Sequence, residues 1–370
     1  MNAFCILFAD NNETLDLSEL SNERTLASVP FGGRYRLVDF ILSSLVGAKI
    51  QNIGIVTRDK YGSLMDHVGW GKDWDLNRKN GGIKFLTPFL KNHEFAAIGG
   101  NRIEALNSVM DYIKTSLPEY CVLCDSNTVL NVDLEKFMAF HEEKGADITF
   151  AYKRMKTSAK ELEVKLDAEG KLVDTMYHQY PHYDEKDIQL NLVVMKKDFM
   201  IDLIEKGITY GWYSIKRDVI AHRFNEYKMY GYKVDGYTVV IKSVEDYYNA
   251  NMELLNKDVR LELFMGKNPI LTRIKDSVPT IYGEECKVTN SLVADGCKIE
   301  GTLENCIVFR DVKVAKGAVI RDSILMQGTE IGQNCQLNCV ITDKNVIVRE
   351  GNVLAGTKTM PFIVNKGKIV

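Results

Sequence analysis

The sequence predicts two domains: an N-terminal α/β domain with a doubly wound mixed sheet, and a C-terminal left-handed parallel β-helix of hexapeptide repeats. Up to about residue 250, short apolar runs alternate with amphipathic helical stretches, as a doubly wound sheet requires. After Asn268-Pro269 the chain changes to short β-rich units marked by Gly, Asn and Asp. At 370 residues, 45% of them hydrophobic, the chain can form two separate cores.

The elements of the first half follow from apolar periodicity. Four internal strands are expected in short apolar runs, at 52–57, 119–125, 147–153 and 190–195. Helices are expected where apolar residues recur at helical spacing, at 37–49, 102–115 and 134–145. Alternation around Glu169-Gly170 predicts a hairpin over 165–176 at the edge of the sheet.

The second half contains a repeat. Four units share a small residue, two or three aliphatic residues, a polar turn and another aliphatic pair; they cover 290–301, 305–317, 322–334 and 338–351. Their small residues Ser291, Cys306, Ser323 and Cys339 are 15, 17 and 16 residues apart, close to one coil of a three-sided β-helix. An Ig-like or barrel domain of short strands is the alternative, but it would lack this self-similarity.

Some hexapeptide proteins are acyltransferases that use a histidine of a coil as a base. The last histidine of this chain is His222, well before the repeats. The β-helix is therefore expected to serve packing, oligomerisation or communication with the first domain.

Charge and composition narrow the classes of partner. Lys plus Arg number 47 against 50 Asp plus Glu, mixed along the chain, so nucleic acid is not an expected partner. No signal peptide and no membrane-length apolar stretch is recognisable, so no membrane partner and a cytoplasmic location are expected. Eight scattered cysteines are then expected to be free, buried thiols, and "CVLC" (121–124) has half the spacing of a zinc site without a second half.

The opening stretch "AFCILFADNNETL" (3–15) predicts a first strand followed by a loop. At the carboxyl edge of a doubly wound sheet such a loop commonly binds phosphate, through exposed backbone N–H groups and usually a cation. This loop has no glycine, lysine or arginine. It resembles a nucleotide loop that has lost its function.

Three segments carry a resemblance to a known family: "SVPFGGRYRLVDFILSS" (28–44), "WDLNRKNGG" (74–82) and "YYNANMELL" (247–255). Together they resemble the bacterial ADP-glucose pyrophosphorylase (glucose-1-phosphate adenylyltransferase) family, over essentially the whole chain. The resemblance implies a nucleotidyltransferase-like domain over 1–255, a linker over 256–280 and a β-helix domain over 281–370.

The positions that this family uses for chemistry are altered here. Its glycine-rich phosphate loop is replaced by Ala9, Asp10 and Asn12, with Thr14 near its arginine position, and Leu26-Ala27 stands where its lysine-proline pair would be. Its two Mg²⁺ aspartates correspond to Asn127 and Val240, although Asp125 could partly compensate. Its sugar-binding segments correspond to 100–104, 176–183 and 188–191, which do not keep its residues.

This pattern resembles the D-type, non-catalytic subunits of glycogen biosynthesis in that family. The resemblance implies a regulatory subunit without a cofactor of its own, although active relatives use Mg²⁺, that assembles with a catalytic paralogue, as a tetramer in some bacteria. Two alternatives are a weakly active adenylyltransferase, making ADP-glucose from ATP and glucose 1-phosphate, and an independent module that binds a sugar phosphate or nucleotide.

Arg34 and Arg36 are the candidate residues for binding a phosphorylated effector, because two arginines one residue apart can present guanidinium groups to a phosphate. The alternative is that they pair with acidic neighbours such as Asp39 and only fix the helix. Other candidates are expected to be structural. Trp70, Trp74, Tyr247 and Tyr248 should pack in the core, whereas His178 and His182 should lie in a solvated loop.

Overall fold

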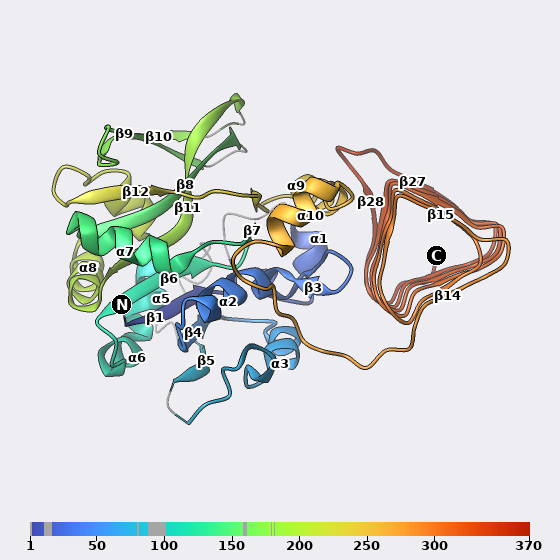
Figure 1. Ribbon diagram of the computed structural model, residues 1–370, viewed down its shortest axis with the longest axis horizontal. Coiled ribbons are helices and arrows are strands. Elements are labelled where there is room, and N and C mark those ends of the chain that lie inside the picture. Colours follow the sequence, from blue (N-terminus) through green and yellow to red (C-terminus); the bar gives the residue numbers. More distant parts are fainter. Residues whose placement is uncertain are drawn as a thin grey trace.

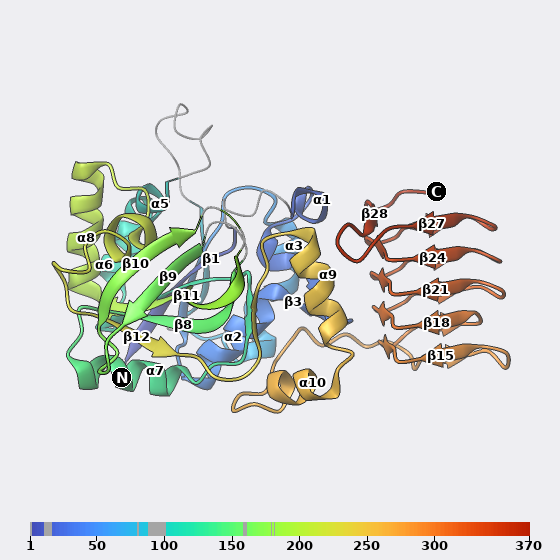
Figure 2. The ribbon, with the colours of Figure 1, turned by 90° about the horizontal axis from the view of Figure 1, so that it is seen from above.

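The computed structural model describes residues 2–10, 17–79, 81–87, 101–157, 161–178, 180 and 182–370. The α/β domain and the β-helix lie side by side along the longest axis, and Figure 1 looks down the triangular coils of the β-helix. Figure 2 shows these coils stacked beside helices α9 (Val244–Glu253) and α10 (Lys257–Phe264), which lie on the side of the α/β domain that faces them.

The α/β domain is built on a mixed sheet, as predicted. In the described part of the chain it has nine strands in the order β10-β9-β11-β6-β1-β4-β5, with β8 against β11 and β12 against β8. The strands β5, β4, β1 and β6 are parallel, and β11 runs antiparallel to β6. Their bounds are β1 (Ala3–Phe8), β4 (Asn52–Val56), β5 (Gly82–Leu86), β6 (Tyr120–Asp125), β8 (Ile148–Thr157), β9 (Glu161–Leu166), β10 (Leu172–His178), β11 (His182–Lys196) and β12 (Met229–Lys233). The predicted edge hairpin is confirmed as β9 and β10.

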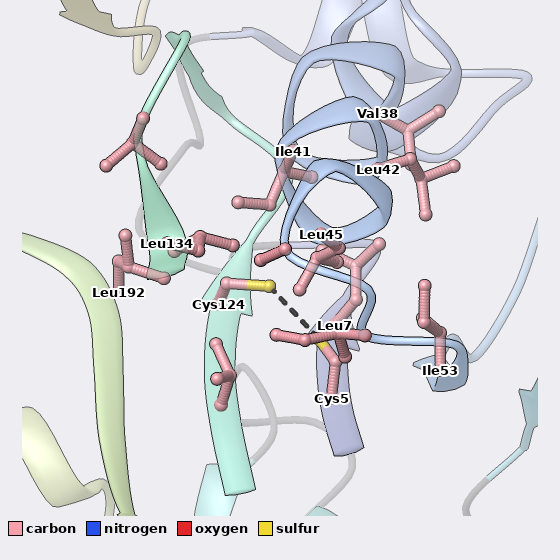
Figure 3. Packing of buried hydrophobic residues seen from close by; sticks show 14 of the residues in the cluster. Cys5, Leu7, Val38, Ile41, Leu42, Leu45, Ile53, Cys124, Leu134 and Leu192 are labelled. Carbon is pink, nitrogen blue, oxygen red and sulfur yellow. Dashed lines mark hydrogen bonds between the residues drawn. The ribbon is translucent and has the colours of Figure 1, made fainter. Parts of the chain in front are cut away.

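Helices cover both faces of this sheet. On one face lie α2 (Leu37–Gly47) and α7 (Leu134–Lys144), and on the other α5 (Arg102–Ser108), α6 (Met110–Thr115) and α8 (Lys197–Tyr210). Figure 3 shows the first of these cores, where Cys5 and Cys124 lie with their sulfur atoms 3.4 Å apart beneath α2. The single helix predicted over 102–115 is wrong, because the chain leaves helical geometry at Val109 (φ −106°, ψ 19°).

The cysteine prediction is confirmed: all eight thiols are free, and all but the half-buried Cys286 are buried. Among the described residues, no helix is long and apolar enough to cross a membrane.

The α/β domain also contains shorter elements. These are α1 (Ser18–Ser21), β2 (Pro30–Phe31), β3 (Tyr35–Arg36), α3 (Gly62–Val68), β7 (Thr128–Leu130), the π-helix Ile215–Ile220, which packs with α5 and α8, and β13 (Thr238–Val240).

Trp74, in a 3-10 turn after α3, is fully buried as predicted, but Trp70 is 80% exposed, so its assignment to the core was wrong.

The β-helix has three faces, each a parallel sheet of five strands. The first face consists of β14 (Ile281–Tyr282), β17 (Lys298–Ile299), β20 (Lys313–Val314), β23 (Glu330–Ile331) and β26 (Ile347–Val348). The second consists of β15 (Lys287–Thr289), β18 (Thr302–Glu304), β21 (Val319–Arg321), β24 (Gln336–Asn338) and β27 (Val353–Ala355). The third consists of β16 (Leu292–Val293), β19 (Ile307–Val308), β22 (Ile324–Leu325), β25 (Val340–Thr342) and β28 (Phe362–Val364).

The predicted repeat sets the register of these coils. The residues after Ser291, Cys306 and Ser323 stack on one another, so that Leu292, Ile307 and Ile324 form one column, which Ile341 continues. Ile341 lies two residues after Cys339, so the fourth predicted small residue is wrong by one position: Val340 is the equivalent of Ser323, and Cys339 has the left-handed backbone of a corner (φ 51°). Corners between faces use left-handed backbone, for example at Asn305 (φ 53°), which explains the Asn and Asp residues of the polar turns.

The two domains share a hydrophobic core. Phe31 and Phe40 of the α/β domain and Tyr247 and Tyr248 of α9, which pack as predicted, meet Ile307, Ile324 and Ile341 of the third face. Burying one such side chain stabilises a fold by about 1.5–3 kcal/mol, so the β-helix is firmly docked.

Candidate functional site

Ala9 and Asp10, directly after β1, are bound to the segment around Leu26. Asp10 accepts the N–H of Leu26 (3.0 Å) at its Oδ1, and Ala27 donates its N–H to the carbonyl of Ala9 (2.9 Å). Leu26 lies in the core shared by the two domains, where the family resemblance expects a lysine. Burial raises the pKa of Asp10, against the effect of its hydrogen bond with Leu26. Thr14 and Asn12 lie outside the described residues.

The two positions that correspond to metal ligands do lie side by side. Strand β13 pairs with β7, which places Val240 opposite Thr128, the neighbour of Asn127. The Asn127 side chain donates from Nδ2 to the carbonyl of Ile241 (3.1 Å), and the N–H of Ile241 donates to the Asn127 carbonyl (2.8 Å). An amide bound to the backbone and a valine thus occupy the place of two carboxylates.

Asp125 does not supply the missing charge. Its Oδ2 accepts hydrogen bonds from Arg102 Nη2 (2.8 Å) and from Asn191 Nδ2 (2.7 Å). The Arg102 guanidinium also lies 4.7 Å from the centre of the Phe8 ring. Mg²⁺ needs oxygen ligands in octahedral geometry, normally with carboxylates, and these residues do not fit it. In the described ranges, no group of three or more His, Cys, Asp and Glu residues could hold a metal ion.

Strand β9 carries two internal ion pairs, and one of them binds His178 in the segment 176–183 that the resemblance compares with sugar binding. Lys242 Nζ lies 2.8 Å from Glu161 Oε1, and His178 Nε2 lies 2.6 Å from Glu163 Oε2. Both pairs are largely buried. The prediction of a solvated His178 was therefore wrong, since it ends β10 beside a strand that carries a carboxylate; of His182 the structure shows that it begins β11.

A second site lies between the domains. A pocket of about 40 Å³, with room for more than one water-sized group, is lined by cations from three parts of the chain. They are Arg34 and Arg36 of the α/β domain, Arg273 and Lys275 of the connecting segment, and Arg310 and Lys344 of the β-helix.

The structure thus brings the two predicted effector residues together with four others that were not predicted. Arg310, Gln327 and Lys344 line the same pocket and are 17 residues apart, one coil each. This spacing within the repeats is the signal that could have identified the β-helix side of the pocket. The arginine and lysine of the connecting segment leave no comparable pattern.

Arg36 begins helix α2 at the edge of this pocket. Its N–H donates to Asp39 Oδ2 (2.9 Å), whereas its guanidinium donates to the carbonyl and hydroxyl of Ser63 (2.5 and 2.9 Å). The other Asp39 oxygen is 2.6 Å from His67 Nε2. Asp39 therefore fixes the helix through the backbone of Arg36, and the guanidinium does not pair with it. Arg34 is exposed at the rim.

The pocket is strongly positive. Burial, together with nearby Arg24 and Arg273, lowers the pKa of Arg36 to about 10, although Asp39 opposes this. Burial and the charges of Arg36 and Arg24 lower the pKa of Lys344 to about 7. Groups whose charged form is disfavoured in this way are stabilised by an anion placed among them.

Comparison with known proteins defines the class. Residues 16–163 match the family described as nucleotidyl transferase, and residues 277–359 match the family described as GlmU-like, C-terminal hexapeptide. Together with the fold, these matches define a nucleotidyltransferase-type domain joined to a hexapeptide β-helix.

The chain is 35% identical over 357 residues to the glycogen biosynthesis protein GlgD of Bacillus subtilis (strain 168), with 95% of this chain and 93% of that protein covered. It is 39% identical over 356 residues to GlgD of Geobacillus stearothermophilus, with the same coverage. Identity to the glucose-1-phosphate adenylyltransferase of Bacillus mycoides (strain KBAB4) is 26% over 94% of this chain and 93% of that enzyme. The protein belongs to the GlgD family within the ADP-glucose pyrophosphorylase group.

Proposed function

We propose that this protein is a regulatory, catalytically inactive subunit of glucose-1-phosphate adenylyltransferase in glycogen biosynthesis, and that it modulates a catalytic paralogue. The observation that carries the proposal is the pairing of Asn127 with the backbone of Ile241 beside Val240. The place that would hold Mg²⁺ in an active relative is closed by neutral groups. Membership of the GlgD family supports the role in glycogen biosynthesis.

The expected loss of activity is large. Removing one group that stabilises transition-state charge typically costs about 10²–10³ in rate. Here both metal carboxylates are replaced, and Leu26 occupies the position of a phosphate-binding lysine. Such losses do not simply add, but together they place adenylyl transfer by the isolated chain below detection.

The regulatory part of the proposal rests on the interdomain pocket. A phosphorylated effector could accept charge-assisted hydrogen bonds there, each contributing about 1.5–3 kcal/mol. Its ligands belong to both domains and to the segment between them, so occupancy can change how the β-helix sits on the α/β domain. In a hetero-oligomer, which we expect to be a tetramer, this change would reach the catalytic paralogue through subunit contacts.

The test compares the isolated protein with its mixture with a catalytic paralogue. We expect no ADP-glucose above background from the isolated protein with ATP, glucose 1-phosphate and Mg²⁺. The mixture should co-elute and show an effector response that differs from that of the paralogue alone. A paralogue whose two metal aspartates are replaced is the matched control, because its mixture must remain inactive if this chain supplies no chemistry.

Two other results would replace the proposal. A turnover of roughly one per second by the isolated protein would make it an adenylyltransferase in its own right. Separate elution, with no effect on the paralogue, would make it an independent binding module.

A further inference from the structure

We infer that Lys344 binds an anion in the interdomain pocket together with a proton, so that the affinity of the pocket for anions falls as the pH rises through the neutral range. This inference rests on the proposed effector role of the pocket and adds a regulation to it. It concerns one side chain that has no role in the fold of the coils.

The carboxylate next to Lys344 in the sequence, that of Asp343, is bound by Arg24 and not by the Lys344 ammonium group. Lys344 follows Asp343 in the turn after β25, and its side chain is half-buried. Arg24 Nη2 donates hydrogen bonds to both carboxylate oxygens of Asp343 (2.8 and 2.7 Å). The backbone N–H of Lys344 also donates to Asp343 Oδ1 (2.7 Å). In the part of the chain that the structure describes, no hydrogen bond or ion pair reaches the Lys344 ammonium group.

Positive groups face Lys344 from all three parts of the chain. The α/β domain contributes Arg24 and Arg36, the connecting segment contributes Arg273 and Lys275, and the β-helix contributes Arg310. Arg34 adds a further positive group at the rim, and the remaining titratable groups that line the pocket are Tyr35, on β3, and His67, on α3.

Most carboxylates around the pocket already accept hydrogen bonds. Asp39 is bound by His67 and by the backbone of Arg36, and Asp295 is bound by Arg310 (3.1 Å). Asp311 accepts a hydrogen bond from Gln327 (3.0 Å). Arg273 donates to the backbone carbonyl of Asp66, so the Asp66 carboxylate still contributes one negative charge near Arg36. Without a bound anion the pocket therefore contains more positive than negative charge. Loss of a proton from Lys344 reduces the repulsion among these cations.

The direction of the linkage follows from these contacts. Burial and the neighbouring arginines lower the pKa of Lys344 to about 7, and partial burial with Arg310 and Arg273 lowers that of Lys275. A bound anion favours the charged ammonium and raises the pKa of Lys344 again. Above pH 7 the anion must then bind together with a proton, and one proton taken up weakens binding about tenfold per pH unit.

The experiment titrates the full-length protein with inorganic sulfate, whose charge does not change between about pH 6 and pH 9, by calorimetry in buffers of different ionisation enthalpy. We expect sulfate affinity to fall with pH and proton uptake to approach one per sulfate near pH 8. K344R, which keeps the charge at every pH, should bind sulfate with a flat pH profile. K275R should retain the wild-type slope and is the matched control for the second lysine.

The outcomes separate this inference from the proposed function. If the wild-type protein binds no sulfate at any pH, the pocket is no anion site and its proposed effector role fails. If the wild-type protein binds sulfate with a flat pH profile, or if K344R keeps the wild-type slope, the pocket is an anion site and the inference about Lys344 is wrong. Circular dichroism of each variant shows that the comparison is between folded proteins.

Discussion

The buried ion pair between Arg24 and Asp343 should be a main polar interaction that stabilises the contact between the two domains. Both side chains are almost fully buried, with 3% and 4% of their surface exposed, and two hydrogen bonds of 2.8 and 2.7 Å join them across 319 residues of sequence. The substitution D343N keeps the size of the side chain and removes its charge. Breaking a buried pair by removing one partner costs about 3–5 kcal/mol, because the remaining charge is left buried without compensation.

The chain provides a matched control for this change. Lys366 and Glu23 join the same two regions through a pair of similar length, 2.9 Å, but both side chains are substantially exposed. Exposed ion pairs contribute little in water, so K366M should leave the unfolding midpoint unchanged within error.

Denaturant unfolding should be followed by tryptophan fluorescence and by circular dichroism. All three tryptophans belong to the α/β domain, so coincidence of the two probes shows whether the domains unfold together. D343N should lower the midpoint strongly, and the double variant R24M/D343L should recover most of the loss by replacing the pair with apolar groups. If D343N and K366M behave alike, the buried pair does not hold the domains together and this reasoning is refuted.

Four further predictions follow from the cleft, the pocket and the core. N127D alone should not restore adenylyl transfer in a steady-state assay, since Val240 and Leu26 remain. Rescue by this change would show that the other groups needed for catalysis are intact. R36A in the mixed complex should lower activation by the effector about tenfold, or about 1.4 kcal/mol of coupling, and an unchanged response in an assembled complex would exclude Arg36. Truncation after residue 270 should abolish the oligomer, because it removes the partner of the shared apolar core; a tetrameric truncated protein in light scattering would locate assembly elsewhere. Burial lowers the pKa of His141 from 6.5 to about 4, so between these pH values the unfolded chain binds more protons than the folded one. The free energy of unfolding should therefore fall as the pH decreases from 6.5 towards 4, and it should fall less steeply in H141Q.

The sequence was most informative where one physical constraint repeats. The spacing of Ser291, Cys306 and Ser323 predicted the coils because stacked strands must present equivalent residues at each turn. In the fourth unit the prediction chose Cys339, whereas its neighbour Val340 is the equivalent residue. The two tryptophans of one loop show the opposite case. Trp70 and Trp74 lie four residues apart, and only the fold decides that Trp74 is buried beside His67 and Leu64 while Trp70 is exposed.

Some residues of the candidate sites could be predicted from the sequence, and others could not. Asn127 and Val240 could be found from the resemblance, since each stands at a known position, and the structure shows them adjacent. Arg102, which neutralises Asp125, could not be found, because a contact across 23 residues leaves no local pattern. The cations of the interdomain pocket come from segments between residues 34 and 344, and only the fold brings them together.

The segment around Leu26 takes part in docking the β-helix. Leu26, which the resemblance matches to a phosphate-binding lysine, is buried in the core that the two domains share. Two residues before Leu26, Arg24 binds Asp343 of the β-helix. Asp343 is followed directly by Lys344 in the interdomain pocket. The segment that would bind nucleotide in an active enzyme therefore connects the β-helix, the pocket and the end of β1. Restoring the lysine at residue 26 would place a charge in this core, so catalysis and the present domain contact compete for the same residues.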